Sequence, residues 1–209
     1  DDALHCDYIL NIGAVGTDGP RITVTSCYEG LEGAAVNICS GSIDIHSADD
    51  CINAANADLT GFSYQLNISG GTVTARSDSG DGIDSNGDLT ISGGNVTVWT
   101  ANTADNEPLD ADGTVTVSGG TVLAAGGSVG MGVSLAATQP CAIFTGSGVA
   151  GGMNMPGPGA LGGASLLTQG TAFTVTSADG TVLYSGEAVY NASFLFFSSG
   201  DLSDGESYT

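Results

Sequence analysis

The sequence has almost no basic side chains. It contains no lysine and only two arginines, Arg21 and Arg76, against 23 acidic residues, which gives a formal net charge of -21. Binding to nucleic-acid phosphates depends on Lys and Arg, and anionic membrane surfaces attract basic segments. The composition therefore argues against both partners. It favours a cation-binding or strongly solvated surface, which suits a secreted or cell-surface protein.

Long apolar runs are also missing. No segment approaches 18 consecutive apolar residues, so no membrane-spanning segment is predicted. The sequence has no signal peptide at its start, but Asp1 falls inside the first copy of a repeat. We therefore expect the chain to be a mature or trimmed product, with a signal and further repeats ahead of Asp1.

Cysteine is present without any metal-binding spacing. The five cysteines form no CxxC pair, and their positions fit no zinc motif: Cys6, Cys27, Cys39, Cys51 and Cys141. The first, second and fourth lie near equivalent points of successive repeats, so one disulfide between neighbouring repeats is expected outside the cytoplasm. The odd count leaves at least one thiol free or intermolecular, and the pairing stays open.

The first half of the chain repeats one acidic template. Each copy has an acid first, Leu or Ile third, and an acid, Asn or His fourth, and the copies start about 21 to 31 residues apart. The clearest copy lies in the stretch Gly80 to Asp88. The five copies are Asp2-Ala3-Leu4-His5, Glu29-Gly30-Leu31-Glu32, Asp50-Cys51-Ile52-Asn53, Asp81-Gly82-Ile83-Asp84 and Glu107-Pro108-Leu109-Asp110.

Two short alternating segments follow each template, separated by a glycine-containing break. The first set is Ile9 to Ile12, Ala35 to Cys39, Leu66 to Ser69, Leu89 to Ser92 and Val115 to Ser118. The second set is Ile22 to Thr25, Ile43 to His46, Val73 to Arg76, Val96 to Trp99 and Val122 to Ala125. Alternating Val, Ile and Thr bounded by Gly indicates strands, and a period of 20 to 50 residues without helices indicates a solenoid. We predict an all-β fold, a single-stranded parallel β-helix with three strands per rung; the family resemblance described below implies that the coil is right-handed.

The template stops near Gly127, and a different organisation follows. We expect the rungs to occupy residues 1–145 and a Gly-, Met- and Pro-rich loop to occupy residues 146–165. Residues 166–209 contain the alternating runs Ala172 to Thr176, Val182 to Tyr184 and Phe194 to Phe197. These are predicted to form a C-terminal β cap of the same domain, with antiparallel or rung-continuing strands, because an uncapped coil leaves backbone groups unpaired.

The stacked templates predict a column of acids and a calcium site. Neighbouring strands lie about 4.7 to 4.9 Å apart, and two carboxylates at that distance repel by roughly 3.5 kcal/mol at an effective dielectric of 20. A cation between them would remove that cost, and oxygen-rich sites suit Ca²⁺. The alternative is a solvated acidic edge that keeps the protein soluble. The candidate ligands are Asp2, Glu29, Glu32, Asp50, Asn53, Asp81, Asp84, Glu107 and Asp110.

The last strand of each rung carries a second candidate site. If the apolar residues of these strands face inward, then Thr25, His46, Arg76 and Trp99 face outward in one column. Tryptophan can stack on a sugar ring while Arg binds a hydroxyl or a carboxylate. His46, Arg76 and Trp99 are therefore candidate carbohydrate-binding residues. The alternative is a cation–π pair on an ordinary sheet face.

Four of these motifs, in order, resemble a bacterial family of carbohydrate-binding domain-containing proteins. They are Asp2 to His5, Glu29 to Gly33, Asp49 to Ala54 and Gly80 to Gly87; Ser128 to Pro140 and Ser198 to Thr209 resemble the family's exit segment and final strand. The family's prototype is a calcium-bearing right-handed parallel β-helix, similar to pectate lyases, that binds cellulose and polygalacturonate. The resemblance implies calcium near the acidic column without fixing the ligands. Cys51 replaces the family's usual Gly, and Cys6, Cys27 and Cys39 are also atypical.

Three functions remain as hypotheses at this point. The leading one is non-catalytic binding of an acidic or cellulosic polysaccharide, with Ca²⁺ stabilising the coil and bridging to uronate carboxylates. The second is a subunit of an extracellular filament or surface layer, built by head-to-tail stacking of copies. The third and least favoured is a polysaccharide lyase, which would need Arg21 or Arg76 as its base, although neither belongs to the acidic template.

Overall fold

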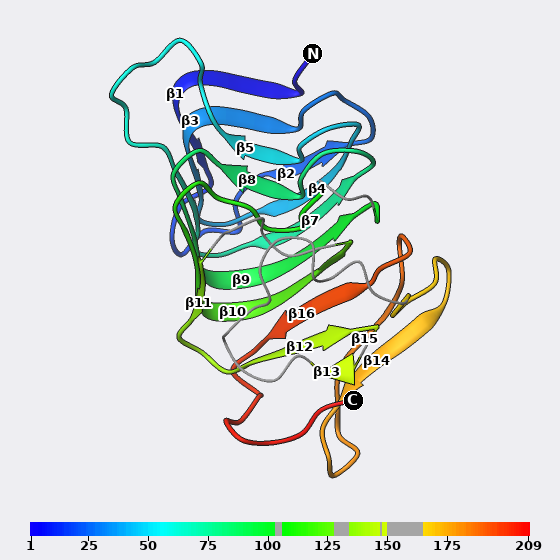
Figure 1. Cartoon of the computed structure of the whole chain (residues 1–209). Coiled ribbons are helices and arrows are strands. Elements are labelled where there is room, and N and C mark those ends of the chain that lie inside the picture. Colours follow the sequence, from blue (N-terminus) through cyan, green and yellow to red (C-terminus); the bar gives the residue numbers. More distant parts are fainter. Residues whose placement is uncertain (103–105, 128–133, 147, 150–164) are drawn as a thin grey trace.

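The chain forms a coil of parallel strands closed at one end by antiparallel strands (Figure 1). This computed structural model describes residues 1–102, 106–127, 134–146, 148–149 and 165–209. The described residues contain no helix. They therefore contain no helix that is long and apolar enough to cross a membrane. The predicted all-β parallel coil is confirmed, with about five turns.

Three stacks of parallel strands form the coil. The first stack contains the start of β1 (Leu4–Ile12), the start of β3 (Leu31–Ile38), β5 (Ile52–Ala54) and β8 (Ile83–Ser85). The second contains the ends of β1 and β3, then β6 (Gln65–Ile68) and the first halves of β9 (Asp88–Thr100), β10 (Thr114–Gly126) and finally β11 (Ser134–Ala137). The third contains β2 (Arg21–Val24), β4 (Ser42–Ser47), β7 (Thr72–Ser77) and the second halves of β9 and β10.

The alternating apolar residues of these strands fill the inside of the coil. On the third stack, Ile43, Val73 and Val96 pair in register and are at most 1% exposed. The corner between the second and third stacks is turned by stacked glycines with positive φ, among them Gly71 and Gly94. A Cβ on Gly94 would lie 2.8 Å from the Gly71 carbonyl oxygen, so only glycine fits this corner.

The C-terminal residues pack against the last rung in the opposite direction. Strand β16 (Phe194–Ser198) pairs antiparallel with the end of β10, and β12 (Cys141–Thr145) pairs antiparallel with β16 and with β13 (Gly148–Val149). Strands β14 (Ala172–Thr176) and β15 (Val182–Glu187) form a separate antiparallel hairpin. The C-terminal cap is therefore antiparallel rather than rung-continuing. Most of the expected loop at 146–165 lies outside the described residues.

The opposite end of the coil presents strand β1 at its edge (Figure 1). Among the described strands, β1 pairs only with β3. Leu4 and Ile9 on this strand are 40% and 52% exposed. Head-to-tail stacking of copies would need such an edge strand, and the stacking hypothesis stays a prediction.

A candidate cation site along the acidic column

The acidic templates stack in the register that the repeat predicts. Leu31 pairs with Leu4 and Ile52, Ile52 pairs with Ile83, and Ile83 forms a bridge with Leu109. From Leu31 onward these side chains are at most 6% exposed. The fourth template residues therefore follow one another along the outside of the first stack, in the order His5, Glu32, Asn53 and Asp84, with Asp110 next in the chain after Leu109.

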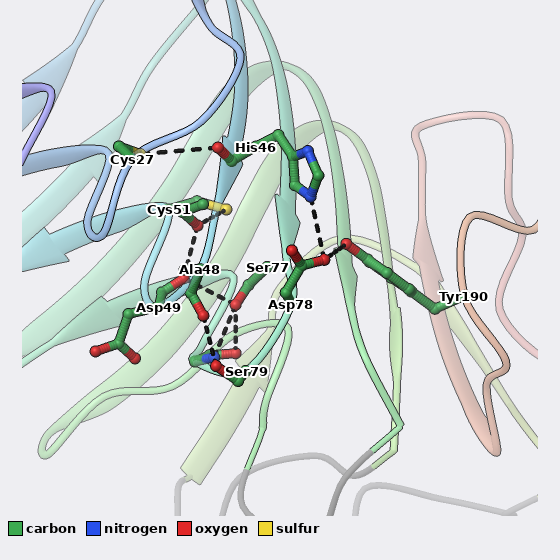
Figure 2. A network of polar contacts seen from close by, with 11 residues as sticks. Cys27, His46, Ala48, Asp49, Cys51, Ser77, Asp78, Ser79 and Tyr190 are labelled. Atoms are coloured by element: carbon green, nitrogen blue, oxygen red, sulfur yellow. Dashed lines mark hydrogen bonds and ion pairs between the residues drawn. The ribbon is translucent and has the colours of Figure 1, made fainter.

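Serine hydroxyls shape the corner that leads into each template. The Ser47 hydroxyl donates to the Asp49 carbonyl at 2.6 Å. One rung later, the Ser77 hydroxyl lies 2.8 Å from the Asp49 and Gly80 carbonyls and accepts the Gly80 N–H (Figure 2). Ser47 and Ser77 are 1% and 0% exposed, so these bonds fix a buried turn immediately before the acids.

The first acid of two templates also bonds to the backbone of the next rung. Asp50 Oδ1 accepts the Asp81 N–H at 2.7 Å, and Asp81 Oδ1 accepts the Glu107 N–H at 2.7 Å. These bonds use one carboxylate oxygen of each aspartate. They hold the column in register, which is a structural role that the sequence pattern did not predict.

Three aspartates converge at the C-terminal half of the column. One carboxylate oxygen from each of Asp81, Asp84 and Asp110 lies within 4.8 Å of the other two. Among the described residues, no ion pair reaches any of the three, because Arg76 pairs with Asp44 and both histidines pair elsewhere. The group is therefore a concentration of negative charge without a basic neighbour.

Burial makes the carboxyl groups of Asp81 and Asp84 weaker acids than usual. Desolvation is the main cause that raises the pKa of Asp81 and of Asp84 to about 7, and the neighbouring carboxylates add to it. Burial also raises the pKa of Asp50 to about 6, although its bond from the Asp81 backbone opposes the change. Asp112, which the template did not include, contributes to the raised pKa of Asp84. The position of Asp112, two residues after Asp110, is the signal in the sequence that could have placed it beside the acidic column.

Asn53 supplies a buried oxygen with no donor. Its Nδ2 donates to Asp50 Oδ2 at 3.1 Å and to Glu29 Oε2 at 3.5 Å. Its Oδ1 is buried and has no hydrogen-bond partner among the described residues. Asn53 pairs in register with Asp84, so this amide belongs to the same column as the aspartate cluster. A buried carbonyl oxygen without a donor is costly unless a cation or a water binds it.

Glu29 and Glu107 lie in the column but outside the aspartate cluster. Burial raises the pKa of Glu29 to about 7, with further contributions from Glu32 and Asp50. Glu107 is 3% exposed, and its backbone N–H is the donor to Asp81. Neither residue is a member of the aspartate cluster: Glu29 lies near Glu32 and Asp50, and Glu107 contacts Asp81 through its backbone.

At the N-terminal end of the column, one imidazole lies among three carboxylates. His5 Nδ1 lies 2.6 Å from Glu32 Oε2 and 3.4 Å from Asp2 Oδ2, and its Nε2 lies 3.2 Å from Asp7 Oδ1. The Glu32 bond is the main cause of a raised pKa of His5. Asp2 and Glu32, both predicted as calcium ligands, thus have a protein partner that the aspartate cluster lacks.

The outward column of the third stack differs from its prediction at Trp99. His46, Arg76 and Trp99 do pair in register, as expected. However, Trp99 is only 2% exposed, because the C-terminal residues cover it, and its ring meets Phe173 edge-on at 5.9 Å between centroids. The prediction that Trp99 forms an exposed sugar platform is therefore wrong.

The other two members of this column are held by acids. The Arg76 guanidinium pairs with Asp44. His46 Nε2 lies 3.1 Å from Asp78 Oδ1, which also accepts the Tyr190 hydroxyl at 2.6 Å, so the cap is fastened to the coil here (Figure 2). Two members of this column therefore help to attach the C-terminal cap, Trp99 directly and His46 through Asp78, whereas Arg76 pairs within the coil.

Replacing Trp99 with phenylalanine tests this correction. We expect the free energy of unfolding to fall by roughly 1–2 kcal/mol, because the smaller ring leaves a void in a close-packed core. Binding to polysaccharide should stay within twofold of the original protein. Denaturant unfolding and pull-down measure the two quantities, and weaker binding at unchanged stability would restore Trp99 as a binding residue.

The cysteines form no disulfide. All five are free, although Cys27 and Cys51 lie on neighbouring rungs. Cys27 Sγ lies 3.7 Å from the His46 carbonyl, and Cys51 Sγ lies 3.0 Å from the Ser47 hydroxyl (Figure 2). Burial raises the pKa of Cys51 to about 12, which makes its thiol unreactive. The expected disulfide between rungs is therefore not formed.

The fold and the column define a β-solenoid with an oxygen-lined acidic edge. Residues 9–205 match the profile of a family described as carbohydrate-binding domain-containing protein, and the chain belongs to this family. No curated protein and no solved structure matches the chain. Membership of the family supports a polysaccharide-binding role.

Proposed function

We propose that this chain is an extracellular, non-catalytic polysaccharide-binding protein whose coil is stabilised by calcium in the acidic column. Family membership supports polysaccharide binding. The observation that carries the calcium proposal is the buried Asn53 Oδ1 without a donor, in the column that also holds the Asp81, Asp84 and Asp110 carboxylates.

The donor set fits a hard cation. Calcium prefers six to eight oxygen ligands from carboxylates, amide carbonyls and water, and the column offers the first two kinds. Asp81, Asp84 and Asp110 would hold the ion, with Asp50 and the Asn53 carbonyl as neighbouring donors. The bound ion would supply the positive charge that the two arginines cannot provide, since both lie on the third stack.

Calcium would also reconcile the charge of the protein with an acidic ligand. A protein of formal net charge -21 repels polygalacturonate unless cations lie between them. An ion held by the column with open coordination positions could accept a uronate carboxylate. This extends the proposal to acidic plant polysaccharides.

Chelation tests this bridging role. We expect the amount of protein that polygalacturonate pulls down to fall by about tenfold or more when EDTA is added. The reason is that each bridging ion contributes a charge-assisted contact. Circular dichroism in the same buffers separates loss of bridging from loss of fold. Unchanged pull-down in EDTA with an intact fold would overturn the bridging role.

The lyase alternative gains no support from the site. Proton abstraction beside a uronate carboxylate needs a basic group close to the metal-bound substrate. Arg76 is paired with Asp44 on the third stack, and the described residues place no lysine or arginine in the acidic column. Binding without catalysis is the function that the column favours.

A further inference from the structure

The second stack carries a flat outer surface that the acidic column does not use. Its inward residues are fully apolar and buried, as Leu66, Ile68, Leu89 and Ile91 show at 0% exposure. The residues between them point outward in two columns. The column of Asn11 is polar on five successive rungs, whereas the column beside it begins with Ile9 and Ala35 and is polar only from Gln65 onward. We call this surface the amide–hydroxyl face, and it consists of Asn11, Asn37, Gln65, Asn67, Asp88, Thr90, Thr114 and Thr116.

The centre of this face is a column of uncharged side chains in strict register. Asn11 pairs with Asn37, Asn37 with Asn67, Asn67 with Thr90, and Thr90 with Thr116. The amides bond along the column, because Asn37 Nδ2 donates to Asn11 Oδ1 at 2.9 Å and Asn67 Nδ2 donates to Asn37 Oδ1 at 3.0 Å. These bonds fix the side-chain directions before any ligand binds, which lowers the entropy cost of binding.

The other two faces of the coil are less suited to a long polar ligand. The first stack carries the aspartate cluster and would repel any acidic group that is not bridged by a cation. The third stack is covered where Trp99 and Leu123 meet the C-terminal cap, and both are at most 2% exposed. On the amide–hydroxyl face, by contrast, Asn11, Gln65 and Asp88 are exposed, and the other members are half-buried: Asn37, Asn67, Thr90, Thr114 and Thr116.

The chemistry of the face selects the kind of partner. Amide and hydroxyl groups both donate and accept hydrogen bonds, as sugar hydroxyls do, and Asp88 is the one charged member of the face. The column repeats at the strand spacing of about 4.8 Å along the coil axis. A regular row of donors and acceptors at that spacing suits a polymer that presents hydroxyl groups at a regular interval.

We propose that the amide–hydroxyl face binds an extended, uncharged polysaccharide chain that lies along the coil axis. The proposal rests on the proposed polysaccharide-binding function and adds to it the surface and the ligand class. Thr90 and Thr116 lie at the centre of the contact, since both are half-exposed and pair directly with each other. Calcium has no part in this contact.

Paired glutamate substitutions test the face. In Thr90→Glu/Thr116→Glu we expect at least a tenfold loss of affinity for amorphous cellulose, because two bulky charges would interrupt the uncharged column. The matched control is Thr74→Glu/Thr97→Glu, which changes two half-exposed threonines that pair in register on the third stack. The control adds the same charge and should bind within twofold of the original protein. Equal affinity of both variants, or equal loss in both, would overturn the proposal.

A milder pair covers the case in which the glutamate variant does not fold. Thr90→Val/Thr116→Val keeps the β-branched shape that suits strands and removes only the hydroxyls. We expect a threefold to tenfold loss of affinity, against no loss in Thr74→Val/Thr97→Val, with thermal unfolding recorded for all four variants. Unaltered binding of the first valine variant would overturn the proposal.

The unmodified protein separates this inference from the proposed function. Binding to polygalacturonate in calcium without binding to amorphous cellulose would overturn the uncharged-ligand inference and leave the proposed function standing. Binding to neither polymer would contradict both. Binding to cellulose that is lost only in the Thr90/Thr116 variants supports both.

Discussion

Replacing Asp81 and Asp84 together with asparagine should remove most of the stabilisation that calcium gives to this protein. For the original protein at pH 8, calcium at about 100 times its dissociation constant should raise the free energy of unfolding by about 2.7 kcal/mol. The variant should gain less than about 1 kcal/mol under the same conditions, because it lacks two of the three clustered carboxylates. Thermal unfolding with calcium or EDTA measures both gains.

The same variant should be at least as stable as the original protein in EDTA. Asparagine removes two buried charges that repel each other and keeps an oxygen that can accept the Glu107 N–H in place of Asp81 Oδ1. The matched control is Asp18→Asn/Asp58→Asn, which removes two exposed charges elsewhere. The control should keep the full calcium effect, and an equal calcium effect in all three proteins would contradict a site at the cluster.

Without calcium, the fold should become less stable as the pH rises from 5 to 8. The folded-state pKa values of about 7 for Asp81 and Asp84 and about 6 for Asp50 lie above the ordinary value of 3.8. Between 3.8 and these values the folded state binds more protons than the unfolded state, so the free energy of unfolding falls as the pH increases. At about 1.4 kcal/mol per pKa unit, these three groups together should lower the free energy of unfolding by at most about 7 kcal/mol between pH 5 and pH 8.

Thermal unfolding in EDTA across this pH range measures the effect. A chain of this length changes its melting temperature by roughly 2–4 °C per kcal/mol, so the midpoint should fall by about 10 °C or more between pH 5 and pH 8. Asp78 and Asp179 have lowered pKa values, so their contributions are lost only below pH 3.8 and do not affect this window. The Asp81→Asn/Asp84→Asn variant should show a smaller fall, and Asp50 and Glu29, whose raised pKa values remain, account for what is left of it. A midpoint that rises with pH would contradict the raised pKa values.

The rung structure could be predicted from the sequence because a parallel coil obeys a local rule. Each template residue stacks on the same residue of the next rung, so aligning the repeats also aligns the structure. The predicted equivalence of Leu31, Ile52 and Ile83 is the observed register, and the predicted inward residues of the third stack fill the core. The convergence of Asp81, Asp84 and Asp110 follows from the same rule.

The environment of Trp99 could not be predicted in the same way. Alternation along β9 correctly placed its side chain outside the coil, in one column with His46 and Arg76. Whether an outward residue meets water depends on segments far along the chain, here Phe173 and the cap. No local period encodes that contact.

The disulfide prediction failed for a related reason. The repeat places Cys6, Cys27 and Cys51 on successive rungs, but a disulfide also needs the two Cβ atoms to face each other at about 3.8 Å. In the structure Cys6 pairs with Gly33 rather than with a cysteine, and Cys51 is buried in the core. Two cysteines on neighbouring rungs are therefore weaker evidence for a disulfide than two cysteines at the same position of the template would be.

The position of Trp99 also gives the molecule a built-in optical probe. It is the single tryptophan of the chain, and it belongs to the apolar cluster between the coil and the cap, with Val175 and Phe197, rather than to the core inside the coil. Its fluorescence emission therefore reports on the junction of coil and cap, whereas far-ultraviolet circular dichroism reports on all strands together. If the two signals change at the same denaturant concentration, coil and cap unfold as one cooperative unit; if the fluorescence changes at the lower concentration, the junction of coil and cap opens first.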